Sequence, residues 1–192
     1  EGKLDAQFLA AFLAQKERDE ASSQKAVEHC TTLIESIYKD VEKYKDYCGI
    51  ALTEEDARRL KAEGKKAFFI GIENGYAIGK DIKNVKKYKD MGVQYMTLSH
   101  SYDNDICNSS SNTADASKGL TAFGRKVVKE MNKVGMMIDV SHVSTKTMFN
   151  KDFYPTPTTV IDRMMQFSDV EGKVILEPSA GSGNIVDWCK SR

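Results

Sequence analysis

The chain has 192 residues, a length that suits one domain, or one domain and part of a second. Its 28 Lys and Arg residues balance 28 Asp and Glu residues, so no bulk charge favours binding to nucleic acid or to an anionic membrane. Hydrophobic residues make up 41% of the chain, which allows a real core, but no apolar run is long enough to span a bilayer. The 4 cysteines form no C-x-x-C pair and are typical of free thiols, a pattern that leans toward the cytoplasm without fixing the compartment.

Apolar residues spaced three and four apart predict amphipathic helices. Such helices are expected over about residues 22–46, 54–63, 82–91 and 123–134. Thr53 can cap the second of these helices, and Gly64 can end it. Gly92 and Gly135 are expected to end the third and the fourth.

Short apolar runs between these helices predict strands, at about residues 48–52, 67–72, 95–98 and 136–140. Strands that alternate with helices indicate a parallel α/β sheet. About four strands fit either a doubly wound sheet or half of an eight-stranded barrel. Glu73, His100 and His142 each follow the end of a strand, which is the rim where barrel enzymes carry their catalytic groups. The sequence therefore favours the partial barrel.

Glu73, His100 and His142 are also the residue types of a hydrolytic metal site, because carboxylate and neutral imidazole both bind zinc. Residue types alone favour a structural interpretation. In it His142 caps a helix that begins near Val143, His100 forms a hydrogen bond within a loop, and Glu73 is a solvated charge. The polar stretch 101–119 follows His100 directly, and its position suggests an active-site loop.

Four blocks of sequence between about residues 4 and 148 resemble the membrane (renal-type) dipeptidase family, in the family's order. They are residues 67–75, 91–100, 119–128 and 138–144. The resemblance implies part of a (β/α)₈ TIM-like barrel that hydrolyses the peptide bond of dipeptides by a metal-bound hydroxide. It implies that Glu73 bridges two zinc ions, that His142 binds one of them, and that His100 contacts the substrate.

The same resemblance implies an incomplete site. The family's His-x-Asp pair lies upstream of Glu1. Its last zinc histidine, and the arginine and aspartate that handle substrate and protons, lie beyond Phe149, where the similarity ends. We therefore expect this chain alone to bind zinc weakly or not at all and to be inactive, and no catalytic residue is assigned. Asn74 stands where the family commonly has glycine.

The character of the chain changes near residue 150. Residues 153–157 are expected to be extended because each proline disfavours helix before it. A strand over residues 173–176 then leads through a glycine turn into a last helix. Taken alone, that turn is either an ordinary β-α connection or a helix start that receives a polar ligand.

Residues 153–190 together resemble the start of an N6-adenine DNA methyltransferase, which implies a short Rossmann-like β-α fragment. The resemblance implies that six residues hold S-adenosylmethionine: Tyr154, Pro155, Thr156, Glu177, Gly181 and Gly183. The motif that would hold a flipped adenine is absent from the sequence, so neither methyl transfer nor nucleic-acid binding is expected. The sequence thus predicts a chimera of a partial dipeptidase barrel, residues 1–149, and a methyltransferase-like fragment, residues 150–192. The alternative function is binding of S-adenosylmethionine by the second part.

Overall fold

The computed structural model describes residues 4–112 and 118–148. The six residues predicted to bind S-adenosylmethionine, and the predicted second part as a whole, lie outside the described residues. The strands are β1 (Ala6–Phe12), β2 (Cys48–Ile50), β3 (Lys66–Glu73), β4 (Val93–Thr97) and β5 (Met137–Asp139). The helices are α1 (Glu20–Lys43), α2 (Glu54–Ala62), the 3₁₀ turn η1 (Gly75–Ile78), α3 (Lys83–Asp90), α4 (Ala122–Val134) and α5 (Thr145–Met148).

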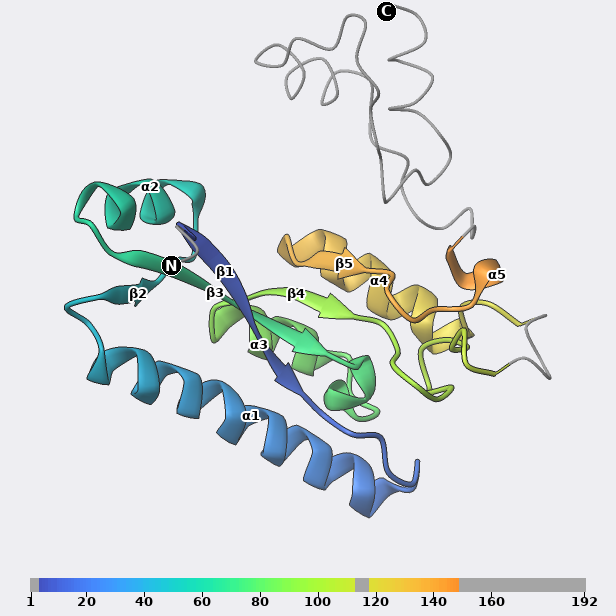
Figure 1. The fold of residues 1–192 in the computed structure, drawn as a ribbon. Helices are drawn as coiled ribbons and strands as arrows, with labels where there is room; N and C mark the ends of the chain where they lie inside the picture. The colour runs from blue at the N-terminus through green and yellow to red at the C-terminus, as the bar shows by residue number, and fades with distance from the viewer. Residues whose placement is uncertain (1–3, 113–117, 149–192) are drawn as a thin grey trace, which may run out of the picture. The chain divides into compact units, whose positions relative to one another are not determined.

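The strands form one parallel sheet in the order β1-β3-β4-β5. β1 lies along the whole of β3, from the pair Ala6 and Ala67 to the pair Phe12 and Glu73. The short strand β2 pairs only with the beginning of β3, where Cys48 lies opposite Lys66. Parallel neighbours need a crossover connection, and the helices supply it, as the ribbon shows (Figure 1). The predicted parallel α/β sheet is therefore confirmed.

The four predicted helices begin and end within three residues of the positions expected from the sequence. Asp19 caps α1 through a hydrogen bond to its side chain from Ser22 N. Thr53 caps α2 and forms a reciprocal capping box with Asp56. Gly135 ends α4 in the left-handed conformation that glycine adopts without steric cost. These local signals set where each strand starts after its helix.

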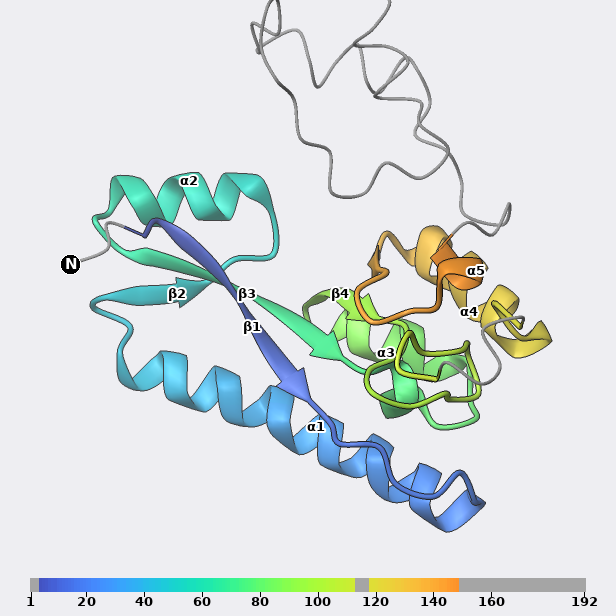
Figure 2. The same ribbon diagram turned by 45° about the vertical axis from the view of Figure 1, so that its right-hand side comes forward.

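The core lies between the sheet and the helices that run beside it. In both views α1 follows the sheet beneath β1 and β3 (Figures 1 and 2), and α4 packs beside β5 (Figure 1). Side chains alternate between the two faces of a strand, so Ile70 and Ile72 share one face of β3 and are fully buried. Phe69 and Glu73 share the opposite face. There Phe69 packs 5.2 Å from the ring of Phe8, which stays 43% exposed.

β1 is the strand that was not predicted. The predicted strands overlap β2, β3, β4 and β5, whereas no strand was expected at Ala6–Phe12. The sequence does carry a signal there, because residues 8–14 form a continuous apolar run, which is consistent with a strand. Within β1 only Ala11 is buried, because this edge strand is exposed along most of its length. The apolar run therefore marks the strand even though most of its side chains are exposed.

Candidate metal centre

The three predicted site residues follow three neighbouring strands and lie at one edge of the sheet. Glu73 is the last residue of β3, His100 follows β4 by three residues, and His142 follows β5 by three residues. β3, β4 and β5 are adjacent and parallel, so their carboxyl ends meet at the same edge. The expected convergence at one rim is confirmed.

The side chains are close enough to act on one ligand. Glu73 Oε1 lies 3.3 Å from His100 Nε2 and 3.7 Å from His142 Nε2. The two imidazole rings have centroids 4.4 Å apart. Each of the three residues offers a ligand atom within 4.8 Å of the other two. Among the described residues this is the one group of three or more His, Cys, Asp or Glu side chains with such spacing.

The ring of His100 is held on two sides. Its Nδ1 lies 2.8 Å from Ser101 Oγ, a distance that fits a hydrogen bond. The ring of Phe12, at the end of β1, meets it edge-on with centroids 5.0 Å apart. A partner on Nδ1 orients an imidazole and leaves Nε2 as the free nitrogen. In this chain Nε2 is the atom that faces Glu73.

His142 is placed by its backbone. It has a φ of 64°, which is uncommon for a residue with a Cβ atom, and its carbonyl oxygen accepts a hydrogen bond of 2.8 Å from Ser110 N. The helix that follows is capped by Ser144, whose Oγ accepts from Thr147 N at 3.2 Å. The interpretation of His142 as a helix cap is therefore wrong. The left-handed backbone turns the ring toward the rim instead.

The polar stretch after His100 is an ordered connection over its described part, residues 101–112. The carboxylate of Asp103 accepts hydrogen bonds from Asn108 Nδ2 at 2.6 Å and from Ser109 N at 2.8 Å. Ser109 Oγ donates to the carbonyl of His100. Since Ser110 N donates to the carbonyl of His142, the segment ties both histidines together. Residues 113–117 lie outside the described residues.

The donor set fits a zinc ion. Two atoms that each lie about 2.1 Å from one zinc ion at the tetrahedral angle are roughly 3.4 Å apart, and the two distances from Glu73 Oε1, 3.3 and 3.7 Å, bracket that value. The side chains of Glu73, His100 and His142 are 31%, 25% and 44% exposed, so water and a substrate can reach them. One carboxylate and two imidazoles are also a ligand set found in zinc hydrolases.

A broad hollow of about 1070 Å³ reaches Ser101, the residue after His100, and none of Glu73, His100 and His142 lines it. It lies between the segment after β1 and the polar loop, and its lining includes Lys16, Glu17 and Arg18 on one side and Ser101 and Asp103 on the other. Both signs of charge therefore line this hollow. Arg18 Nη1 also lies 3.7 Å from a carboxylate oxygen of Asp105 in the loop.

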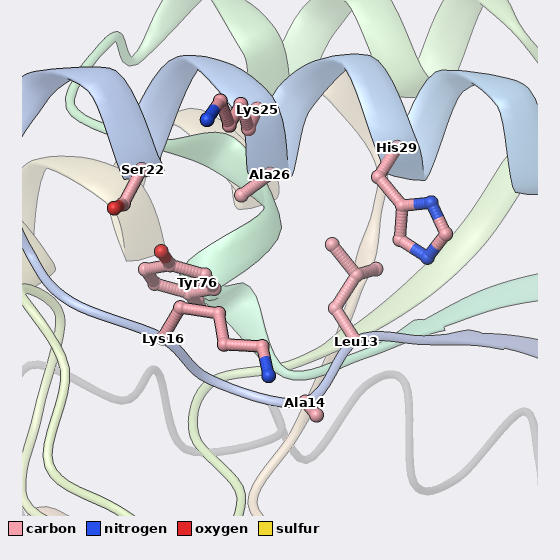
Figure 3. A pocket seen from close by; sticks show the side chains of 8 residues that line it. All are labelled: Leu13, Ala14, Lys16, Ser22, Lys25, Ala26, His29 and Tyr76. Atoms are coloured by element: carbon pink, nitrogen blue, oxygen red, sulfur yellow. The ribbon is translucent and has the colours of Figure 1, made fainter.

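A second, smaller hollow of about 280 Å³ lies under the first turns of α1 (Figure 3). Leu13 and Tyr76 form its apolar floor, and Lys16, Lys25 and His29 stand around it. His29, the third histidine of the chain, thus belongs to this hollow and not to the group at the rim.

Sequence reasoning did not assign a role to several side chains that shape the rim. Phe12 packs against His100, and Asn74 and Asn104 form a buried hydrogen-bonded pair. Thr97 Oγ1 donates to Asp139 Oδ2 at 2.5 Å and so joins the ends of β4 and β5. For Asn74 the sequence offered one signal, its position. It directly follows Glu73, the candidate ligand, and stands where the dipeptidase family commonly has glycine. The others carry no sequence signal because their partners are distant in the chain.

A parallel α/β sheet with a carboxylate and two imidazoles at the carboxyl ends of its strands is the arrangement of metal-dependent barrel hydrolases. Comparison with known proteins agrees. Residues 1–151 match the family described as membrane dipeptidase (peptidase family M19), and the chain belongs to that family. The family is one of metallopeptidases.

Individual relatives are dipeptidases. The chain is 34% identical over 115 residues to dipeptidase tcpJ of Claviceps purpurea (strain 20.1), a match that covers 60% of the chain and 27% of the relative. It is 33% identical over 114 residues to dipeptidase verJ of Clonostachys rogersoniana, covering 59% of the chain and 29% of the relative. A crystal structure of the probable dipeptidase PvdM from Pseudomonas aeruginosa superposes with a TM-score of 0.68 at 30% identity, over 77% of this chain and 39% of that one.

The chain thus spans less than a third of the length of these curated relatives. Among the described residues, none of the helices combines the length and the apolar character that a bilayer crossing requires.

Proposed function

We propose that this chain carries part of the metal centre of a zinc-dependent dipeptidase, with Glu73 and His142 as metal ligands and His100 as a substrate contact. The observation that supports this most strongly is the distance of 3.7 Å between Glu73 Oε1 and His142 Nε2, which lets both atoms reach one ion, with His100 Nε2 3.3 Å from the same carboxylate oxygen. Membership of a dipeptidase family supplies the reaction class.

Each side chain has a distinct task in this proposal. A bound zinc ion polarises a carbonyl group and lowers the pKa of a coordinated water. Glu73 and His142 would hold the ion through a carboxylate oxygen and an imidazole nitrogen. His100 Nε2 lies beside them and, as an N–H donor, would hydrogen-bond to the oxygen that gains negative charge when the peptide bond is attacked. The contacts of His100 with Ser101 and Phe12 keep that nitrogen aimed at the site.

A dipeptide matches the charges beside the site. At neutral pH a dipeptide carries an ammonium group at one end and a carboxylate at the other, only a few bonds from the peptide link. The hollow that reaches Ser101 is lined by Lys16 and Arg18, which attract a carboxylate, and by Glu17, which attracts an ammonium group. We therefore assign the substrate as a small zwitterionic peptide held in this hollow.

The chain by itself is expected to bind zinc weakly and to hydrolyse dipeptides very slowly or not at all. A catalytic zinc ion takes three protein ligands, and this proposal gives Glu73 and His142 to the ion. The resemblance to the dipeptidase family implies further ligands in addition to these two.

Calorimetric titration of the purified chain with zinc tests the proposal. Glu73→Gln and His142→Ala should each weaken zinc binding by tenfold or more, while His29→Ala, a matched loss of an imidazole outside the site, should leave it unchanged. His100→Ala distinguishes a substrate contact from a third metal ligand at this position. A small effect on zinc binding supports a substrate contact, and a loss equal to that of His142→Ala would make His100 a third ligand. Zinc binding that survives both Glu73→Gln and His142→Ala would refute the metal centre.

Residues 150–192 remain a separate proposal, supported by their sequence motifs alone. We propose that they form a distinct part of the chain, whose glycine turn at Gly181 and Gly183 binds S-adenosylmethionine weakly. Equilibrium dialysis with labelled S-adenosylmethionine tests it. Binding that is lost in Gly183→Val supports this function, and no retention at millimolar ligand excludes it.

A further inference from the structure

Asn74 occupies a backbone conformation that normally belongs to glycine. It follows Glu73 directly, its side chain is buried, with 1% of the residue exposed, and its φ and ψ are 88° and 104°. Residues with a Cβ atom rarely adopt a positive φ, whereas glycine adopts it without a steric penalty. A buried asparagine in such a position indicates that its carboxamide contributes something that glycine would not.

The carboxamide of Asn74 joins three separate segments. Its Nδ2 donates to the carbonyl oxygen of Leu13 at 3.1 Å, immediately after the end of β1. Its Oδ1 accepts from Tyr76 N at 3.2 Å, in the turn that follows β3. The same oxygen accepts from Asn104 Nδ2 at 3.3 Å, in the polar loop. The side chain therefore binds to the end of β1, to its own turn and to the loop after His100.

Asn104 extends this connection to β4. It is also buried, with 3% exposed, and its Nδ2 donates to the carbonyl oxygen of Leu98 at 2.7 Å, two residues before His100. Its Oδ1 accepts from the backbone N–H groups of Ile106 and Cys107, at 2.8 and 3.1 Å. Oδ1 and Nδ2 of both asparagines are thus hydrogen-bonded. Buried polar groups that are fully hydrogen-bonded hold a fixed arrangement.

The segments that the two amides join are those that carry the candidate metal centre. Leu13 is next to Phe12, whose ring packs against His100. Leu98 leads into His100, and Asn74 leads out of Glu73.

We propose that Asn74, acting with Asn104, is a positioning residue that sets the spacing of Glu73 and His100. This inference rests on the proposed metal centre, and it explains how Glu73 and His100 are held at their observed spacing. Groups that orient metal ligands through hydrogen bonds typically change metal affinity by 10–100-fold when removed. Asn74 orients Glu73 through the backbone, by fixing the point where β3 leaves the sheet.

The test uses Asn74→Gly, which keeps the backbone conformation accessible and removes only the carboxamide. Cobalt(II) serves as the probe, because its visible absorption reports both affinity and coordination geometry. We expect Asn74→Gly to weaken cobalt binding about tenfold or more and to change the visible spectrum. Asn104→Ser, whose shorter side chain does not reach the carbonyl of Leu98, should act in the same way and serves as a second variant should the first fail to fold.

Thr53→Ala is the matched control. Thr53 caps α2, which packs through Leu60 against the beginning of β3, at the end of the strand away from Glu73. This variant should lower the melting temperature by circular dichroism and leave cobalt affinity and spectrum unchanged.

The outcomes are distinguishable. Cobalt affinity within twofold of the unmodified chain in both Asn74→Gly and Asn104→Ser would overturn the positioning role and leave the metal centre intact. An equal loss of affinity in Thr53→Ala would also overturn it, because the effect would then follow stability alone. Cobalt binding by the unmodified chain that is indifferent to His142→Ala would overturn the proposed function itself.

Discussion

Gly71 in β3 provides the space that Tyr95 of β4 fills. A Cβ atom at position 71 would lie 1.8 Å from Cε1 and 2.3 Å from Cζ of the Tyr95 ring, far inside van der Waals contact. The ring cannot retreat freely, because its edge meets the ring of Phe8 with centroids 5.2 Å apart. Gly71→Ala must therefore displace Tyr95 or separate β3 from β4, two residues before Glu73.

The expected cost is that of overpacking a well-packed site, about 1–3 kcal/mol. For a chain of this size each kcal/mol corresponds to a shift of about 2–4 °C in melting temperature. The backbone of Gly71 does not require glycine, since it lacks a positive φ. In the Tyr95→Ala background, where the ring is gone, the same change should be neutral or stabilise by about 0.4–1 kcal/mol, because alanine loses less backbone entropy on folding.

Urea unfolding of the unmodified chain, of each single variant and of the double variant gives the coupling free energy between the two positions. We expect a coupling of about 1–3 kcal/mol in favour of the double variant. If Gly71→Ala is as destabilising in the Tyr95→Ala background as in the unmodified chain, the steric argument is wrong. The cause would then be the backbone of β3.

Two further predictions concern titrating groups. Hydrogen bonds, above all the one from Leu52 N, lower the pKa of Asp56 below 3.8, so its contribution to stability is present above that pH and is lost as the pH falls through the lower, folded value. The difference in melting temperature between the unmodified chain and Asp56→Ala should therefore shrink below about pH 4, and a difference that is constant down to pH 2 would contradict this. Burial raises the pKa of the Cys30 thiol to about 12 and that of Cys107 to about 11. Because thiolate is the reactive form, peptide mass spectrometry should find both thiols unmodified by iodoacetamide at pH 8 in the folded chain, and rapid labelling would show that they are not buried.

The parts of the fold that sequence predicts are those whose signals are local. Apolar spacing and caps such as Thr53 and Gly135 place the helices, and the apolar runs place β3 and β4. β1 carries the same kind of signal, an apolar run over residues 8–14, although it was not predicted. The sequence alone does not give its partner, because β1 pairs with β3, about sixty residues away, and most of its side chains are exposed.

The candidate site likewise has a part that the sequence predicts and a part that it does not. The position of Glu73, His100 and His142 after successive strands predicts their convergence, because parallel strands present their carboxyl ends at one edge. The support of the site was not predictable, since Asn74 finds its partners at positions 13 and 104. Such hydrogen bonds depend on how loops pack, which spacing along the chain does not reveal.

X-ray absorption at the zinc edge of the zinc-loaded chain tests the central claim most directly. If Glu73 and His142 bind the ion, the spectrum should show imidazole scattering and nitrogen or oxygen ligands at about 2.0–2.2 Å, and the imidazole contribution should fall in His142→Ala. Sulfur ligands at about 2.3 Å would place the ion on cysteines instead. That result, or a shell of oxygen ligands without imidazole, would contradict the metal centre proposed at the rim of the sheet.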